Sequence, residues 1–147
     1  MADTRIALVT GANRGIGFEI VRQLERLGVV TVRSARDPAK AQAAADKLLS
    51  EGIEVGVVPI DVDSDDSCAE GIKQVEDLFG GRLDILVNNA GIMIDGPSTG
   101  TTGLNVSIET IAHTFNTNVL GPLRLIQRAV PLMQKNGYGR IVNISSG

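Results

Sequence analysis

The sequence is poor in cysteine and in aromatic side chains. Cys68 is its only cysteine, tryptophan is absent, and aromatic residues make up 3% of the chain. A single cysteine excludes an internal disulfide framework and a thiolate metal cluster, a pattern typical of proteins from reducing compartments. We therefore expect no metal site and a cytoplasmic location.

Long hydrophobic runs and an excess of basic residues are also missing. No apolar run approaches the ~18 residues that a membrane-spanning helix needs, and residues 1–5 lack the apolar stretch of a secretory signal. The net charge is −3, so no basic face is available to attract nucleic acid. The composition thus predicts a protein without membrane or nucleic-acid partners.

Short apolar runs alternate with helical patterns along the 147 residues, a length that fits one domain. This alternation predicts βαβ units, a parallel sheet and helices on both of its faces. The expected strands are 6–10, 29–34, 54–60, 83–88 and 140–145, and the expected helices are 15–27, 38–50, 65–79 and 107–135. Ligands of such sheets bind beyond the carboxyl ends of the strands, so functional residues should follow each strand.

A glycine-rich segment, T-G-A-N-R-G-I-G at residues 10–17, ends the first expected strand. Gly11 is expected to let the chain turn tightly, Gly15 to let the backbone approach a pyrophosphate, and Gly17 to let the new helix pack close to its strand. The helix N-terminus adds unpaired N–H groups and partial positive charge. Taken alone, the segment also fits an ordinary strand–turn–helix corner.

Asn118 interrupts the apolar stripe of the expected long helix, seven residues after Ile111 and three after Phe115. A polar side chain on such a stripe should be hydrogen-bonded or functional. Pro122 has no N–H and cannot bond the carbonyl of Asn118, so that carbonyl needs a water or a side chain as partner. Asn116, the neighbouring asparagine, is placed on a more polar face.

Two further motifs close the last two expected strands: N-N-A-G at residues 88–91 and N-I-S-S at residues 143–146. With the glycine-rich segment, they make the chain resemble the short-chain dehydrogenase/reductase family from residue 5 to residue 147, most closely its carbonyl-reductase-like branch. The resemblance implies an α/β Rossmann-type doubly wound parallel sheet with strand order 3-2-1-4-5. It also implies further strands after the fifth, so residues 1–147 are expected to form a single NAD(P)-binding domain, an N-terminal portion of a longer protein.

The resemblance also implies roles for individual residues. The family's asparagine, whose carbonyl holds a water in a proton relay, falls on Asn118, and the serine that hydrogen-bonds the substrate carbonyl falls on Ser146. The adenine-contacting pair falls on Asp61 and Val62, with a carboxylate at a helix N-terminus as the alternative for Asp61. The implied cofactor-binding residues are Gly11, Asn13, Arg14, Gly15, Ile16, Gly17, Arg36, Asp61, Val62, Asn89, Ala90 and Gly91.

Cofactor choice depends on the residues after the second expected strand. Ala35 stands where NAD-using members of the family carry a carboxylate, and Asp37, just before Pro38, is better suited to cap a helix. Arg36 and Arg14 together suit the 2′-phosphate of NADP, although either arginine alone is typical of a solvated surface. The sequence therefore favours NADP(H) over NAD(H).

The predicted function is hydride transfer between a nicotinamide and a small-molecule carbonyl or alcohol, by a full-length protein that forms homo-oligomers. The family's acid is a tyrosine followed four residues later by a lysine, after the serine. Tyr138 precedes the fifth expected strand and is followed by Val142 instead, so residues 1–147 alone are expected to be inactive. The alternative is a non-catalytic dinucleotide-binding fragment or truncated regulator. A methyltransferase with a glycine loop leaves the paired asparagines and serines unexplained.

Overall fold

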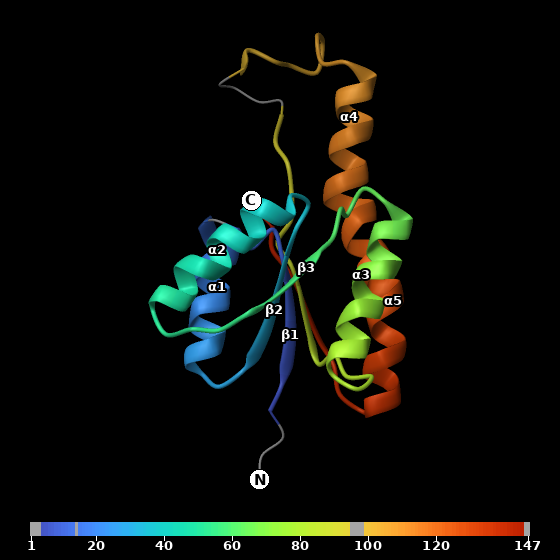
Figure 1. The fold of residues 1–147 in the computed structure, drawn as a ribbon. Helices are drawn as coiled ribbons and strands as arrows, with labels where there is room; N and C mark the ends of the chain where they lie inside the picture. Colours follow the sequence, from blue (N-terminus) through green and yellow to red (C-terminus); the bar gives the residue numbers. More distant parts are fainter. Residues whose placement is uncertain (1–3, 14, 95–98, 146–147) are drawn as a thin grey trace.

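The protein is built around a five-stranded parallel sheet, as seen in a computed structural model that describes residues 4–13, 15–94 and 99–145 (Figure 1). The order of the strands across the sheet is β3-β2-β1-β4-β5, so the predicted order is confirmed. The strands are β1 (Ile6–Thr10), β2 (Val30–Ala35), β3 (Gly56–Pro59), β4 (Ile85–Asn88) and β5 (Arg140–Asn143).

The central strand β1 is buried along its whole length. Leu8 lies opposite Val32 of β2 on one side and Leu86 of β4 on the other. Both faces of the strand are covered, which explains its continuous apolar run. The outer strands are shorter than predicted, and β5 ends at Asn143, although the Ile144 N–H still donates to the Asn88 carbonyl oxygen at 3.0 Å.

Two helices cover each face of the sheet (Figure 1). On one face lie α1 (Gly15–Arg26) and α2 (Pro38–Ser50), packed through Phe18, Val21, Ala44 and Leu48. On the other lie α3 (Asp65–Leu78) and α5 (Gly121–Asn136), packed through Ile72, Val75, Leu125 and Ala129. This is the doubly wound arrangement that the alternating pattern predicts.

The prediction of a single long helix at 107–135 is wrong in one respect, because the structure divides this segment into three parts. These are α4 (Ile108–Phe115), a π-helical turn η2 (Asn116–Leu120) and α5. The Gly121 N–H donates to the Asn116 carbonyl oxygen, five residues back. Pro122 has no N–H to offer the Asn118 carbonyl, so the regular α-helical ladder cannot continue through this point.

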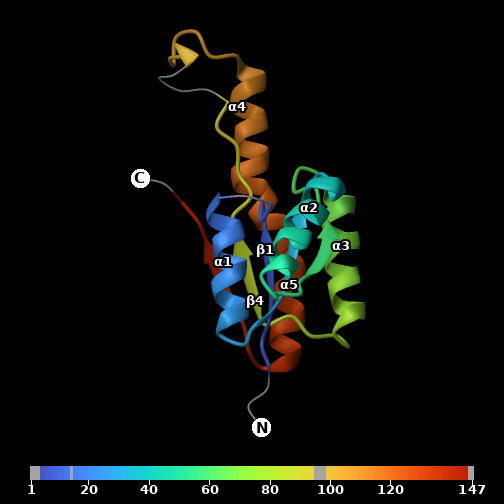
Figure 2. The same ribbon diagram turned by 60° about the vertical axis from the view of Figure 1, so that its left-hand side comes forward.

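The helix α4 stands beyond the carboxyl ends of the strands (Figure 2). Its apolar residues Ile108, Ile111 and Phe115 are exposed, with Ile108 at 75%. None of the helices in the described ranges is long and apolar enough to cross a membrane.

Candidate functional site: a cleft at the carboxyl ends of the strands

A cleft of about 930 Å³ lies where β1, β2, β3 and β4 end. Parallel strands bring the segments that follow them to one edge of the sheet, so residues far apart in the sequence meet there. The structure brings ten of the predicted site residues to this cleft: Gly11, Asn13, Gly15, Ile16, Arg36, Asp61, Val62, Asn89, Ala90 and Gly91. Gly17 and Asn118 are not among its lining residues, and Arg14 and Ser146 fall outside the described residues.

The glycine-rich turn packs tightly against the segment after β4. Gly11 has a φ of +60°, and a Cβ there would lie 2.9 Å from the Ala90 Cα. A Cβ on Gly17 would lie 2.6 Å from the Gly11 carbonyl oxygen and would also overlap the Asn89 amide. Glycine at both positions thus lets the start of α1 approach β1 and β4 closely.

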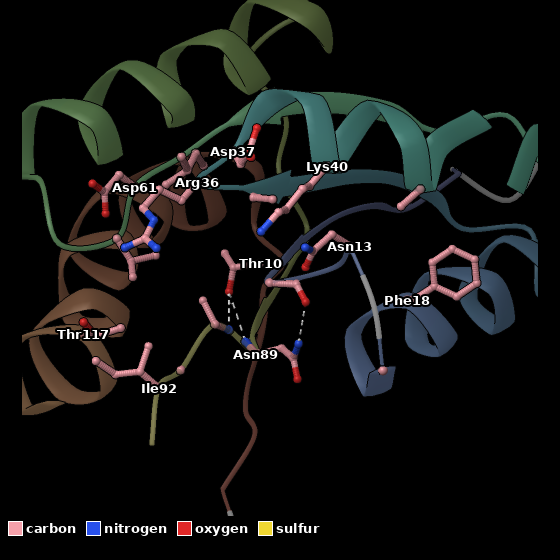
Figure 3. Close-up of a pocket in the computed structure, with 18 of the residues that line it drawn as sticks. Thr10, Asn13, Phe18, Arg36, Asp37, Lys40, Asp61, Asn89, Ile92 and Thr117 are labelled. Atoms are coloured by element: carbon pink, nitrogen blue, oxygen red, sulfur yellow. Dashed lines mark hydrogen bonds between the residues drawn. The ribbon is translucent and has the colours of Figure 1, made fainter. Parts of the chain in front are cut away.

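Hydrogen bonds from Thr10 and Asn89 join the same two segments (Figure 3). The Thr10 hydroxyl accepts the Asn89 N–H at 3.1 Å and the Ala90 N–H at 3.0 Å. The Asn89 side-chain amide donates to the Gly11 carbonyl oxygen at 3.0 Å. Sequence reasoning missed Thr10, whose place as the last residue of a buried strand was the available signal.

Acidic residues occupy the end of the cleft that follows β3. The Asp61 carboxylate accepts the Asp63 N–H at 3.0 Å, and the Asp61 N–H donates to the Ser67 hydroxyl at 2.8 Å. Asp61 therefore shapes the turn before α3 and lines the cleft, whereas the N-cap of α3 is Ser64. The adenine contact of Asp61 stays a prediction.

Asp63 ties this end of the cleft to the long helical segment. Its carboxylate accepts the Thr117 hydroxyl and lies 3.2 Å from the His113 Nε2. Asp63 and Thr117 both line the cleft, and neither was predicted as a site residue. Thr117 is the buried member of the π-helical turn, and this interruption of the helix places it at the cleft.

Basic residues follow β2. Arg36 and Lys40 extend from the β2–α2 segment into the cleft (Figure 3). Neither has a carboxylate partner among residues 4–13, 15–94 and 99–145. Lys40 was missed by sequence reasoning, although its position in the first turn of α2, directly after the ligand-facing segment, was a usable signal.

Asp37 caps α2, as predicted. It precedes Pro38, and its carboxylate accepts the Ala39 N–H at 2.9 Å. Ala35, which the resemblance places where NAD-using members of the family carry a carboxylate, is buried and lines the cleft. The cleft is thus lined by basic residues that follow β2 and by acidic residues that follow β3.

Asn118 binds the chain segment that follows β4. Its amide donates to the Ile92 carbonyl oxygen at 2.8 Å and accepts the Ile92 N–H at 2.8 Å. The side chain is hydrogen-bonded, as predicted, but the stripe that it shares with Ile111 and Phe115 is exposed rather than buried. Both amide functions are engaged, so a role in proton transfer would have to use the main-chain carbonyl of Asn118.

Two other residues with potentially reactive side chains, Tyr138 and Cys68, lie outside the cleft. Tyr138 precedes β5, at the amino ends of the strands, with the Arg5 guanidinium carbon 3.5 Å from its ring centroid. Burial raises the pKa of the Cys68 thiol to about 11, which keeps it protonated and unreactive. No group of three potential metal-ligating side chains occurs in the part of the chain that the structure describes.

Comparisons with known proteins place these observations in a family. The family model described as short chain dehydrogenase matches residues 5–147. An uncharacterized oxidoreductase, YxjF, of Bacillus subtilis is 36% identical over 142 residues, which cover 97% of this chain and 53% of that protein. Carbonyl reductase (NADPH) 1 of Bos taurus is 39% identical over 145 residues, which cover 96% of this chain and 48% of that protein.

The fold is also shared with solved structures. A crystal structure of actinorhodin polyketide ketoreductase with NADPH superposes with a TM-score of 0.88 at 32% identity, covering 99% of this chain and 54% of that one. The chain therefore spans about half the length of the curated relatives it matches.

Proposed function

Because the chain belongs to the short-chain dehydrogenase family, we propose that it forms the cofactor-binding part of an NADP-dependent reductase. The reaction is hydride transfer between a nicotinamide and the carbon of a small-molecule carbonyl or alcohol. One observation carries this proposal: the cleft at the carboxyl ends of the strands is lined by the glycine-rich turn after β1, by basic residues that follow β2 and by acidic residues that follow β3. Its volume lies within the range of about 300–1,000 Å³ that is typical of small-molecule sites.

The residues around the cleft fit the parts of a dinucleotide. The turn after β1 leads into α1, whose N-terminal N–H groups suit the pyrophosphate. Asp61, on the acidic side, can accept a hydrogen bond from the exocyclic amine of adenine. Arg36 and Lys40, without carboxylate partners among the described residues, suit the 2′-phosphate of NADP, and Arg14 is proposed as a further ligand of that phosphate.

NADP is favoured over NAD because the position expected to face the ribose carries Ala35 and not a carboxylate. Ala35 offers no carboxylate to bind the two ribose hydroxyls of NAD or to repel a 2′-phosphate. Two relatives support the same choice, since NADPH is named in the bovine carbonyl reductase and in the polyketide ketoreductase structure. We also propose that residues 1–147 form a single NAD(P)-binding domain.

The bound nicotinamide would supply the hydride, and the chain would position the carbonyl. Ser146 would donate a hydrogen bond to the substrate carbonyl oxygen. Asn118, by holding Ile92, fixes the segment after β4 along the cleft. A proton donor is not supplied by Tyr138, which lies at the amino ends of the strands. We therefore assign the proton donor to a Tyr-x-x-x-Lys segment in a longer natural chain.

A second candidate is a dinucleotide-binding protein without turnover. Within residues 1–147 the only tyrosine is Tyr138, with Val142 four residues later, so these residues alone would bind NADPH without oxidising it. Under this candidate the natural chain binds NADPH and does not oxidise it.

The two candidates are separated by measuring NADPH oxidation with generic aldehydes and ketones. The reductase proposal predicts activity in the full-length natural chain, a loss of at least 100-fold in Ser146→Ala, and none in residues 1–147. A missing general acid alone lowers a rate roughly 10²- to 10⁴-fold. Tight NADPH binding with no turnover in the full-length chain would favour the second candidate.

A further inference from the structure

Arg33 is a fully buried cation in β2. Its relative exposure is 0%, and none of its three guanidinium nitrogens has a hydrogen-bond partner among the described residues. Burial lowers its pKa to about 10, so the side chain is still charged at neutral pH. A buried charge without an ionic or hydrogen-bonding partner is costly, and proteins rarely retain one at a purely structural position.

The guanidinium of Arg33 lies beneath the Phe18 ring, which two other cations also approach. The distance to the ring centroid is 5.5 Å from the Arg33 Cζ, 4.9 Å from the Arg22 Cζ and 5.1 Å from the Lys47 Nζ. The face of an aromatic ring attracts a cation but does not neutralise its charge. Three cations around the Phe18 ring therefore leave a strong positive electrostatic potential there.

Only one of the three cations is neutralised by carboxylates. Arg22 bonds to Glu19 and to Glu51, the latter at 2.9 Å. Within the described ranges, Lys47 has no carboxylate partner. The positive charge of Arg33 and Lys47 is thus uncompensated.

This positive charge borders the cleft. Phe18 and Lys47 line it, and the small residues Ala43 and Ala44 leave room between α1 and α2. Lys47 is seven residues along α2 from Lys40, which is about 10 Å at 1.5 Å per residue. The end of the cleft at Phe18 is therefore separate from the Arg36 and Lys40 side.

We propose that Phe18, Arg33 and Lys47 form a phosphate subsite at the α1–α2 end of the cleft. A guanidinium with all its N–H groups available can bind a phosphate in the bidentate manner that lysine cannot. Arg33 does not itself line the cleft, so phosphate binding requires a rotation of the Phe18 ring that exposes the guanidinium. The phosphate is a free inorganic phosphate, because the 2′-phosphate of the dinucleotide is proposed to bind on the separate Arg36 and Lys40 side of the cleft.

The test uses the full-length natural chain, with inorganic phosphate as the probe and chloride at matched ionic strength as the reference. The variants are Arg33→Met and Lys47→Ala, with Lys73→Ala as control because Lys73 is an exposed lysine paired with Asp77 on α3. Arg33→Met removes a buried charge in favour of an apolar side chain of similar length, a change that is often neutral or stabilising. This variant is therefore expected to fold.

Phosphate is expected to raise the Tm of the parent chain and of Lys73→Ala. In Arg33→Met the dissociation constant for phosphate should increase by an order of 10-fold or more, with a smaller increase in Lys47→Ala. If saturating NADPH, and not NADH, removes the Arg33-dependent effect, the 2′-phosphate of the cofactor occupies this place and a separate subsite for free phosphate is overturned. If the effect persists with both, the site takes a free phosphate.

The proposal is overturned if phosphate does not raise the Tm of the parent chain, or raises the Tm of Arg33→Met equally. Failure of the proposed function would look different, because it would abolish NADPH oxidation and leave the Arg33-dependent phosphate effect in place.

Discussion

Asn118 holds Ile92 with both halves of its side-chain amide. Its Nδ2 donates to the Ile92 carbonyl oxygen and its Oδ1 accepts the Ile92 N–H, each at 2.8 Å. The π-helical turn that carries Asn118 is thereby joined to the segment that continues from β4 along the cleft. A residue predicted for a role in proton transfer thus also determines the path of the cleft wall.

Asn118→Ala is expected to free the segment around Ile92. Two hydrogen bonds are lost, each worth about 0.5–1.5 kcal/mol, so amide hydrogen exchange at Ile92 should accelerate and the affinity for NADPH should fall. Asn116→Ala is the matched control, because Asn116 bonds to Arg124 instead. Unchanged exchange at Ile92 in Asn118→Ala would show that the two bonds are not formed in solution.

Gly17→Ala is expected to destabilise the fold by about 1–3 kcal/mol, the usual cost of overpacking. The added Cβ would lie 2.6 Å from the Gly11 carbonyl oxygen, and a backbone atom in a tight turn cannot move aside cheaply. Gly103→Ala makes the same chemical change in open space and should alter stability by no more than about 0.5 kcal/mol. Urea unfolding of both variants measures the difference, and equal midpoints would contradict the close approach of α1 to β1.

The arrangement of the strands could be predicted from the sequence because its cause is local and repeated. Each apolar run is followed by a helical pattern, and right-handed crossovers then leave few possible sheets. The same reasoning placed the segments after each strand at one edge, which is why ten predicted site residues meet in one cleft.

Other features depend on tertiary packing and could not be predicted in this way. Lys40 and Thr117 reach the cleft only because of how α2 and the π-helical turn are oriented. The apolar stripe of Ile111 and Phe115 suggested burial, yet α4 stands beyond the sheet and leaves it exposed. Periodicity identifies an apolar face but does not show whether anything covers it.

Cys68 is expected to resist alkylation in the folded protein. Burial raises its pKa from an ordinary value of 9.0 to about 11, so almost no thiolate is present at pH 8. Because the unfolded chain loses this proton more readily, the contribution to stability is fully present below pH 9 and is lost as the pH rises toward 11. Rapid iodoacetamide labelling at pH 8 without denaturant would contradict this account of its surroundings.

Residues 1–147 expressed alone are expected to associate. Ile141, Val142 and Ile144 in and after the edge strand β5 are 37%, 44% and 40% exposed, and an unpaired apolar edge recruits other chains. Sedimentation should show species larger than a monomer, and Val142→Lys should reduce them. A monodisperse monomer with cooperative unfolding would contradict this expectation.

The most direct test of the account is the affinity of the full-length natural chain for NADPH and for NADH, measured by titration calorimetry. Charge-assisted hydrogen bonds of about 1.5–3 kcal/mol correspond to roughly 10- to 100-fold in affinity, so NADPH should bind at least tenfold more tightly. The double change Ala35→Asp and Arg36→Ala should reverse the preference, while Lys73→Ala, far from the cleft, should not alter it. Equal affinities for the two cofactors in the parent chain would contradict the assignment of the cleft to NADP.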